Sequence, residues 1–223
     1  MKIISAVFFL LFVLSQQVNA QSEKGKFRLS GDFGYGYRLA KVPSNIPDEL
    51  KDYVKDLKSG VVFDASLDYS IDSNWGVGVY FSRFVSQNSA FINLSLATAD
   101  NIRLTYLAPY VFFKNTSENG LHTLRANFSA GFLGYTNNGN VNSDLFEVKA
   151  NTFGVAMGLD YDIHVSEYVS LGAGVKLIAG STSEFEVTEN GQTRTEKISD
   201  RSVSEDRESL SRLNLTLGLK IYL

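Results

Sequence analysis

The 223-residue sequence contains no cysteine, only two histidines, one tryptophan and three prolines. The lack of cysteine excludes disulfide bridges and thiolate metal ligands, and two histidines leave little imidazole for catalysis or metal binding. Basic residues are not in excess, because the formal net charge is −3, so nucleic-acid binding has no electrostatic support. Beyond the first 20 residues no apolar run is long enough for a transmembrane helix.

The first 20 residues have the three parts of a secretory signal peptide. Lys2 supplies positive charge, residues 3–14 form an apolar stretch, and Val18-Asn19-Ala20 is a small-residue cleavage site. The apolar stretch is shorter than the roughly 20 residues that a membrane anchor needs. We therefore predict residues 1–20 as a signal peptide and residues 21–223 as one exported domain, without a lipid anchor because there is no cysteine to acylate.

The rest of the chain is rich in alternation. Apolar residues occupy every second position over eight segments, which predicts strands with one apolar face and one polar face. The last segment is the most regular, and a strand of this kind at an open sheet edge would invite pairing, so we expect it to close onto the first. The predicted strands are Phe27–Leu39, Val61–Ser70, Trp75–Ser82, Ile102–Lys114, Leu121–Tyr135, Asn151–Ile163, Val169–Gly180 and Ser209–Leu223.

The connections between these strands are alternately short and long. The short turns are Ile71–Asn74, Asn115–Gly120 and His164–Tyr168, and the long connections are Ala40–Ser59, Arg83–Asn101, Thr136–Ala150 and Ser181–Glu208. In the first long connection, apolar residues at helical spacing predict a short amphipathic helix over Ile46–Lys58, capped by Asn45, whose apolar stripe packs on its own protein. Asn190-Gly191 predicts a hairpin in the last connection.

The direction of the apolar face decides between a soluble barrel and a transmembrane one. The apolar phase holds so many large side chains that it would overfill the interior of an eight-stranded barrel. On the fourth strand we assign Ile102, Leu104, Tyr106, Ala108, Tyr110 and Phe112 to this outward face, and Pro109 predicts a bulge. Aromatic residues near strand ends suit the membrane interfaces: Tyr35, Tyr37, Tyr69, Trp75, Tyr106 and Tyr161. We therefore predict an all-β, eight-stranded antiparallel up-and-down transmembrane barrel.

Charged residues of the polar phase are expected to point into the lumen. They are Arg28, Asp32, Arg38, Asp64, Asp68, Arg103, Arg125, Asp160, Asp162, Lys176, Arg212 and Lys220. They could form a conduction path or a proton relay, but buried charges must be compensated, which favours a paired network that fills a closed lumen. Arg28 and Asp68 are the pair that we predict most directly, because both fall near the same end of neighbouring strands.

These features resemble the small eight-stranded outer-membrane β-barrels, also catalogued as porin-family proteins of Gram-negative bacteria. The resemblance rests on the alternating strands, on the run Tyr106–Lys114 (YLAPYVFFK) and on the C-terminal strand. It implies short periplasmic turns, long extracellular loops and contact with outer-membrane lipids and lipopolysaccharide. It also implies that the barrel-insertion machinery reads the last strand, which in the family usually ends in an aromatic residue and here ends in Leu223.

No catalytic, cofactor-binding or metal site is predicted. His122 and His164 fall at or beside short turns without an evident nucleophile, and Asp144 and Asp200 lack the spacing of a calcium loop. The sequence therefore predicts a non-catalytic outer-membrane protein, structural or acting in surface contact and adhesion, with an extracellular partner bound through its loops. The alternatives are a narrow channel for small solutes and an enzyme that modifies lipid A.

Overall fold

A computed structural model of the chain describes residues 26–41, 47–91, 97–142, 144–198 and 207–223. The predicted signal peptide and the expected helix cap Asn45 lie outside these residues. No helix within the described ranges is both long enough and apolar enough to cross a membrane.

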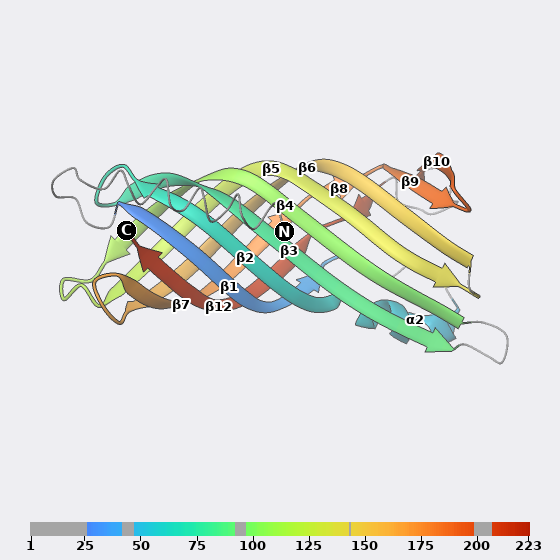
Figure 1. The fold of residues 1–223 in the computed structure, drawn as a ribbon, viewed down its shortest axis with the longest axis horizontal. Helices are drawn as coiled ribbons and strands as arrows, with labels where there is room; N and C mark the ends of the chain where they lie inside the picture. The colour runs from blue at the N-terminus through green and yellow to red at the C-terminus, as the bar shows by residue number, and fades with distance from the viewer. Residues whose placement is uncertain (1–25, 42–46, 92–96, 143, 199–206) are drawn as a thin grey trace, which may run out of the picture.

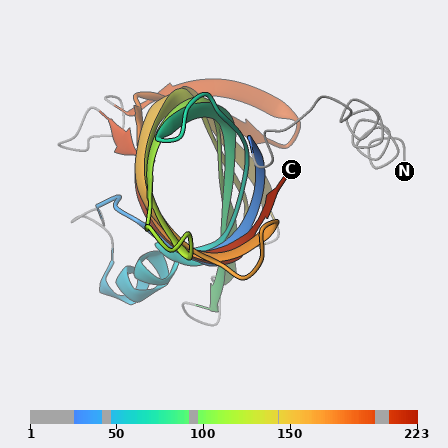
Figure 2. The ribbon, with the colours of Figure 1, turned by 90° about the vertical axis from the view of Figure 1, so that its left-hand side faces the viewer.

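Eight antiparallel strands wind into a closed barrel, seen from the side in Figure 1 and along its axis in Figure 2. Each strand pairs with the next in sequence, and the predicted fold is confirmed. The strands are β1 (Phe27–Arg38), β2 (Ser59–Ser70), β3 (Trp75–Phe91), β4 (Ala97–Thr116), β5 (His122–Val141), β6 (Asp144–His164), β7 (Val169–Ala179) and β12 (Arg212–Tyr222).

The barrel closes between its first and last strands. Strand β12 pairs with β7 on one side and with β1 on the other, where Phe33 lies opposite Leu217. The seam continues to the chain end, because Leu223 N donates to Phe27 O at 2.9 Å. The predicted closure is confirmed, and neither terminal strand of the barrel is left with a free edge.

Alternation places large apolar side chains on the outside of the barrel. Phe33 is 64% exposed and Leu217 is 70% exposed, while Asp32 and Lys220 beside the same seam are buried inside. Five of the six aromatic residues assigned to the interfaces are exposed on the outer surface: Tyr35, Tyr37, Tyr69, Trp75 and Tyr161. The outward apolar band is the surface that a transmembrane barrel presents to lipid.

Strand β4 reverses the face that we predicted for it. Leu104, Tyr106 and Phe112 are fully buried in the lumen, whereas Leu107 and Phe113 are exposed on the outside. The remaining members of the predicted outward set, Ile102, Ala108 and Tyr110, are buried as well, so the assignment of this whole phase to lipid is wrong, including Tyr106 as an interfacial residue. Arg103, which was expected in the lumen, consequently lies in the outward phase.

Glycines on β3 explain the reversal. Gly76 lies opposite Phe112, and Gly78 lies opposite Tyr110. A Cβ atom on Gly76 would fall 2.5 Å from the Phe112 ring, and one on Gly78 would fall 2.7 Å from the Tyr110 ring. The two rings fill lumen space that glycine leaves on the neighbouring strand, which orients β4 with its larger rings inward.

The predicted bulge at Pro109 is also wrong. Leu107 pairs with Phe132 and Tyr110 with Ser129, so the register between β4 and β5 is the same on both sides of the proline. On the other edge of β4, Pro109 pairs regularly with Val79. Proline has no backbone N–H, so it removes one donor from the hydrogen-bond ladder between β4 and β5. The ladder is interrupted there, but no extra residue is inserted.

Two of the predicted long loops are mostly strand. The connections Arg83–Asn101 and Thr136–Ala150 are shorter than expected, because β3 runs on to Phe91, β4 starts at Ala97, β5 reaches Val141 and β6 starts at Asp144. These four strands project past the rest of the barrel on the right of Figure 1. The predicted hairpin in the last connection is confirmed as β9 (Glu184–Glu189) and β10 (Gln192–Lys197), and β9 extends the sheet from β6.

The hairpin turn and a small ladder complete the last connection. Asn190 and Gly191 have φ angles of 50° and 77°, as a two-residue turn between twisted strands requires. Nearer the barrel, β8 (Ser181–Thr182) pairs with β11 (Glu208–Ser209) in a separate two-stranded sheet.

The predicted helix is present as α2 (Asp48–Asp56), with Pro47 at its N-cap. Tyr53 and Leu57 are buried against Ile102 of the projecting sheet, so the expected packing of the apolar stripe on its own protein is confirmed. Tyr53 also donates to Asp100 Oδ2 at 2.5 Å, and Asn88 Nδ2 donates to Tyr53 O at 3.2 Å. Helix α2 is thereby held to both β3 and β4.

Candidate functional site: the charged lumen

Charged side chains from most of the strands meet inside the barrel. Of the twelve residues predicted to face the lumen, eleven are buried: Arg28, Asp32, Arg38, Asp64, Asp68, Arg125, Asp160, Asp162, Lys176, Arg212 and Lys220. Six of these are basic and five are acidic, so the buried charges nearly balance. The exception is Arg103, which the reversal of β4 places outside.

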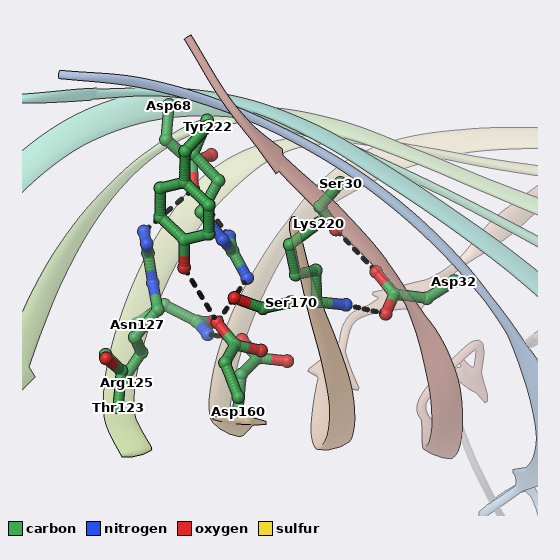
Figure 3. A network of polar contacts seen from close by, with 12 residues as sticks. Ser30, Asp32, Asp68, Thr123, Arg125, Asn127, Asp160, Ser170, Lys220 and Tyr222 are labelled. Atoms are coloured by element: carbon green, nitrogen blue, oxygen red, sulfur yellow. Dashed lines mark hydrogen bonds and ion pairs between the residues drawn. The ribbon is translucent and has the colours of Figure 1, made fainter. Parts of the chain in front are cut away.

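Asp68 joins several strands in a network of polar contacts inside the barrel (Figure 3), and it lies two residues before the end of β2, next to the first short turn. Its carboxylate Oδ2 accepts hydrogen bonds from Arg28 and from Arg125, each at 2.7 Å, and its other oxygen accepts one from Tyr110. Arg28 also donates to Asp162 at 3.0 Å. The predicted Arg28–Asp68 pair is confirmed, and it is part of a network that crosses the lumen.

A second layer of charges lies farther along the lumen. Lys176 Nζ lies 3.0 Å from Asp160 and 3.6 Å from Asp64, and Tyr80 donates to Asp64 at 2.7 Å. Asn127 donates to Asp160 at 2.8 Å. Each carboxylate in this layer therefore has a charged partner and a neutral donor, which offsets its desolvation.

The Lys220–Asp32 ion pair joins the two sides of the seam. Lys220 donates to Asp32 Oδ1, while Ser30 donates to Asp32 Oδ2 at 2.5 Å (Figure 3). Both charged side chains are almost completely buried. The pair links β12 to β1 through side chains in addition to the backbone ladder.

Arg212 is different from the other buried cations. Its Nη2 donates to the Ser82 hydroxyl at 2.9 Å, and no carboxylate in the described ranges lies within ion-pair distance of it. Asn214 donates to the same hydroxyl at 3.2 Å. The buried apolar cluster that contains Phe84 and Leu133 draws its side chains from β2 to β7 and from Leu210.

Packing leaves the charged lumen almost without free space. A cavity lined by charged and polar side chains of the lumen, among them Arg28, Asp32 and Lys176, has a volume of about 10 Å³. A cavity of that volume is at the lower limit of what one water molecule needs. Ion pairs and rings therefore close the barrel in this structure, as the paired-network interpretation expects.

The structure brings together a hydroxyl and an imidazole that are not connected by any motif in the sequence. His164 Nδ1 lies 2.8 Å from Ser170 Oγ, and its Nε2 lies 2.9 Å from Thr123 Oγ1. The expectation that neither histidine has a nucleophile beside it is therefore too strong, since the β6–β7 turn places the pair within hydrogen-bond distance. Ser170 is fully buried, however, so a substrate has no access to its hydroxyl in this conformation.

No protein-family model matches the sequence, and no curated protein matches it. In structure the chain is similar to a major outer membrane protein of Thermus thermophilus, with 11% identity and a TM-score of 0.54 over 88% of this chain and 99% of that one. This chain has the fold of an outer-membrane β-barrel.

Two further solved structures are similar to the chain with lower TM-scores. The outer membrane protease OmpT of Escherichia coli has 10% identity and a TM-score of 0.49 over 92% and 99% of the two chains. Ail, the attachment invasion locus protein of Yersinia pestis, has 12% identity and a TM-score of 0.46 over 88% and 99%.

At these identities the similarity concerns the fold of the outer-membrane barrel and no activity. Within the described ranges, no three histidine or carboxylate side chains gather in a way that could hold a metal ion. Asp144 lies at the exposed start of β6, and Asp200 lies outside the described residues. The lumen is therefore the best-defined polar site of the barrel.

Proposed function

We propose that this protein is a non-catalytic integral protein of the bacterial outer membrane, with a closed lumen and a contact surface outside the cell. The observation that carries the proposal is the contrast between the two polar regions. The lumen is filled by paired charges around a cavity of about 10 Å³, whereas β3 to β6 continue past the barrel and carry exposed polar residues. A structure that closes its interior and extends its outer sheet is suited to contact rather than to transport.

The proposed orientation puts the short turns in the periplasm and the projecting sheet outside the cell. Residues 1–20 act as the export signal, and both ends of the barrel domain remain on the periplasmic side. In this arrangement the outward apolar band contacts membrane lipids, lipopolysaccharide surrounds the outer half, and the insertion machinery engages β12. Helix α2 and the β9–β10 hairpin are then available to an extracellular partner.

The proposal is tested by cell fractionation and by electrical recording. We expect the protein in the outer-membrane fraction, with a mobility on gels that changes on heating, and no steady conductance in planar lipid bilayers. A large and steady conductance would support the narrow-channel alternative and contradict the closed lumen. A change in lipid A acylation on overexpression, absent from the Ser170→Ala variant, would contradict the non-catalytic assignment.

A further inference from the structure

The outward face of β3 to β6 changes in chemistry from row to row beyond the apolar band. Cross-strand neighbours form each row, and the last wholly apolar one is Phe81, Leu107, Phe132 and Phe153. Two rows farther out, Arg103 lies opposite Thr136, which lies opposite Lys149. The next rows contain amides instead. The chemistry of this face thus passes from apolar to basic to neutral polar along the strands.

A hollow of about 920 Å³ lies over the amide rows, and we call it the amide trough. Its first row consists of Gln87, Asn101, Asn138 and Glu147, and its second of Ser89, Ala99, Asn140 and Leu145. These residues share the phase of Leu107 and Phe132, so the rows continue the lipid-facing side of the wall. The tip of the β9–β10 hairpin, with Asn190, also lines the trough.

The polar groups of the amide trough are suited to a ligand that is rich in hydroxyls. Within the described ranges, no hydrogen bond occupies the side-chain amides of Gln87, Asn138, Asn140 and Asn190. Each amide offers two donor hydrogens and an acceptor oxygen, and each hydroxyl of a ligand can donate and accept in return. Several such groups along one surface match a chain of hydroxyls better than a single charge.

The described residues that line the amide trough do not include a cation for an anionic ligand. No lysine or arginine lines it in the described chain. Of its two acidic lining residues, Glu147 shares the phase of the amide rows, whereas Asp100 belongs to the opposite phase of β4. Asp100 already accepts from Tyr53 at 2.5 Å, and Glu147 is 2.6 Å from Lys149 Nζ. Because both carboxylates have partners within the protein, the groups left for a ligand are neutral.

We propose that the amide trough binds an uncharged saccharide. Leu145, which is 73% exposed, provides an apolar contact for the C–H face of a sugar ring. Ala99 also lines the trough, and its small side chain leaves space for the ring. The inference rests on the proposed membrane position. Gln87 lies six residues beyond Phe81 on β3, about 20 Å along the strand, so the trough is in the layer outside the hydrocarbon. The sugar could belong to a glycolipid of the same leaflet or to a free glycan.

Two binding experiments with the full-length protein in lipid nanodiscs separate these sources. In the first, uncharged glucan, mannan and galactan hexasaccharides and one sulfated hexasaccharide are titrated calorimetrically into nanodiscs that contain only phospholipid. In the second, hydrogen exchange at the outer ends of β4 and β5 is compared between nanodiscs whose lipopolysaccharide keeps its neutral sugars and nanodiscs whose lipopolysaccharide lacks them. Binding in the first experiment indicates a free glycan, and protection in the second alone indicates the glycolipid.

Variants test whether the amide trough is responsible. Asn138→Ala combined with Asn140→Ala should weaken the observed binding about tenfold, as expected for the loss of a few hydrogen bonds. Ala99→Gln should weaken it by filling the floor while removing no polar group, so it serves as an independent test if the double variant does not fold. Gln192→Ala, an exposed amide on β10 outside the trough, is the matched control and should bind like the wild type.

Three results would overturn the proposed saccharide site. They are the absence of both calorimetric binding and hydrogen-exchange protection, tighter binding of the sulfated hexasaccharide than of the uncharged ones, and unchanged binding by both trough variants. If the wild-type protein is inserted in the outer membrane but binds no saccharide in either experiment, only this inference fails. If the protein is recovered outside the outer membrane, the proposed function fails with it.

Discussion

Arg28 on β1 and Asp68 on β2 are direct cross-strand neighbours, and the guanidinium donates to the carboxylate at 2.7 Å. Arg125 from β5 reaches the same carboxylate oxygen across the lumen. One buried anion therefore compensates two buried cations, on strands that are not adjacent in the barrel. Removing that anion should affect stability more than removing an exposed carboxylate.

Asp68→Asn should lower the free energy of unfolding by about 3–5 kcal/mol, because it leaves two guanidinium groups buried with less compensation. The measurement is urea-induced unfolding of the barrel in lipid vesicles. Asp52→Asn is the matched control, since Asp52 forms an exposed pair with Lys55 on α2, and it should change the free energy by no more than about 0.5 kcal/mol. Equal effects of the two substitutions would contradict the assigned network.

Arg212→Met should behave in the opposite way. The Arg212 guanidinium is fully buried, and in the described chain it donates to the hydroxyl and carbonyl oxygens of Ser82. A guanidinium buried without a carboxylate partner keeps most of its desolvation cost, and an apolar side chain of similar length removes that cost together with the hydrogen bonds to Ser82. We expect an unfolding free energy within about 1 kcal/mol of wild type, or higher. A loss as large as that of Asp68→Asn would show that Arg212 has a stronger partner.

The reversed face of β4 can be tested with cysteines, because the natural sequence has none. Leu107→Cys should be labelled rapidly by a lipid-soluble maleimide in the assembled barrel, since Leu107 is exposed on the outer surface. Ala108→Cys should be protected, because Ala108 is 1% exposed and faces the packed lumen. Both should react equally after unfolding. Faster labelling at position 108 than at position 107 would contradict the reversed orientation of β4 and support the outward face predicted from sequence.

The contact between α2 and the sheet should weaken at high pH. Burial raises the pKa of the Tyr53 phenol, and its hydrogen bond to Asp100 adds to the increase. The folded protein therefore holds this proton more tightly than the unfolded chain does, so the stabilisation is complete below pH about 10 and decreases as the pH rises above it.

A spin label on Asp56→Cys, at the exposed end of α2, would report this release as increased mobility above pH about 10. In the Tyr53→Phe background, where the phenol proton is absent, mobility should be independent of pH over the same range. A transition that persists in that background would assign the pH dependence to another group.

The inward face of a strand could be predicted from the sequence where only one of its two faces is apolar. In β12, leucines alternate with Arg212, Asn214 and Lys220, so the inward face and the pairing with β1 could both be predicted. In β4 both phases contain large apolar residues, and alternation alone does not distinguish them. The decisive signal lies on the neighbouring strand, where Gly76 and Gly78 leave space for rings.

The outer half of the barrel was less predictable for a different reason. The outer parts of β3 and β5 contain runs with polar residues in both phases, residues 86–89 and 136–140, so alternation does not mark these runs as strand. They are strand because backbone pairing with their neighbours continues beyond the apolar band. The amide trough could not be predicted from the sequence for the same reason, because it depends on the strand pairing that places Asn101 opposite Asn138.

The seam between β1 and β12 also joins the two ends of the barrel sequence. Lys220 and Asp32 are 188 positions apart in the chain, so the contact that completes the cylinder joins its most distant parts. Until β12 joins them, β1 and β7 each expose a row of unpaired amides and carbonyls. Closing so long a loop is entropically costly, and contacts of this range form late. The seam is therefore expected to be the last part of the barrel to form, and β1 and β7 stay open to non-native pairing until it does.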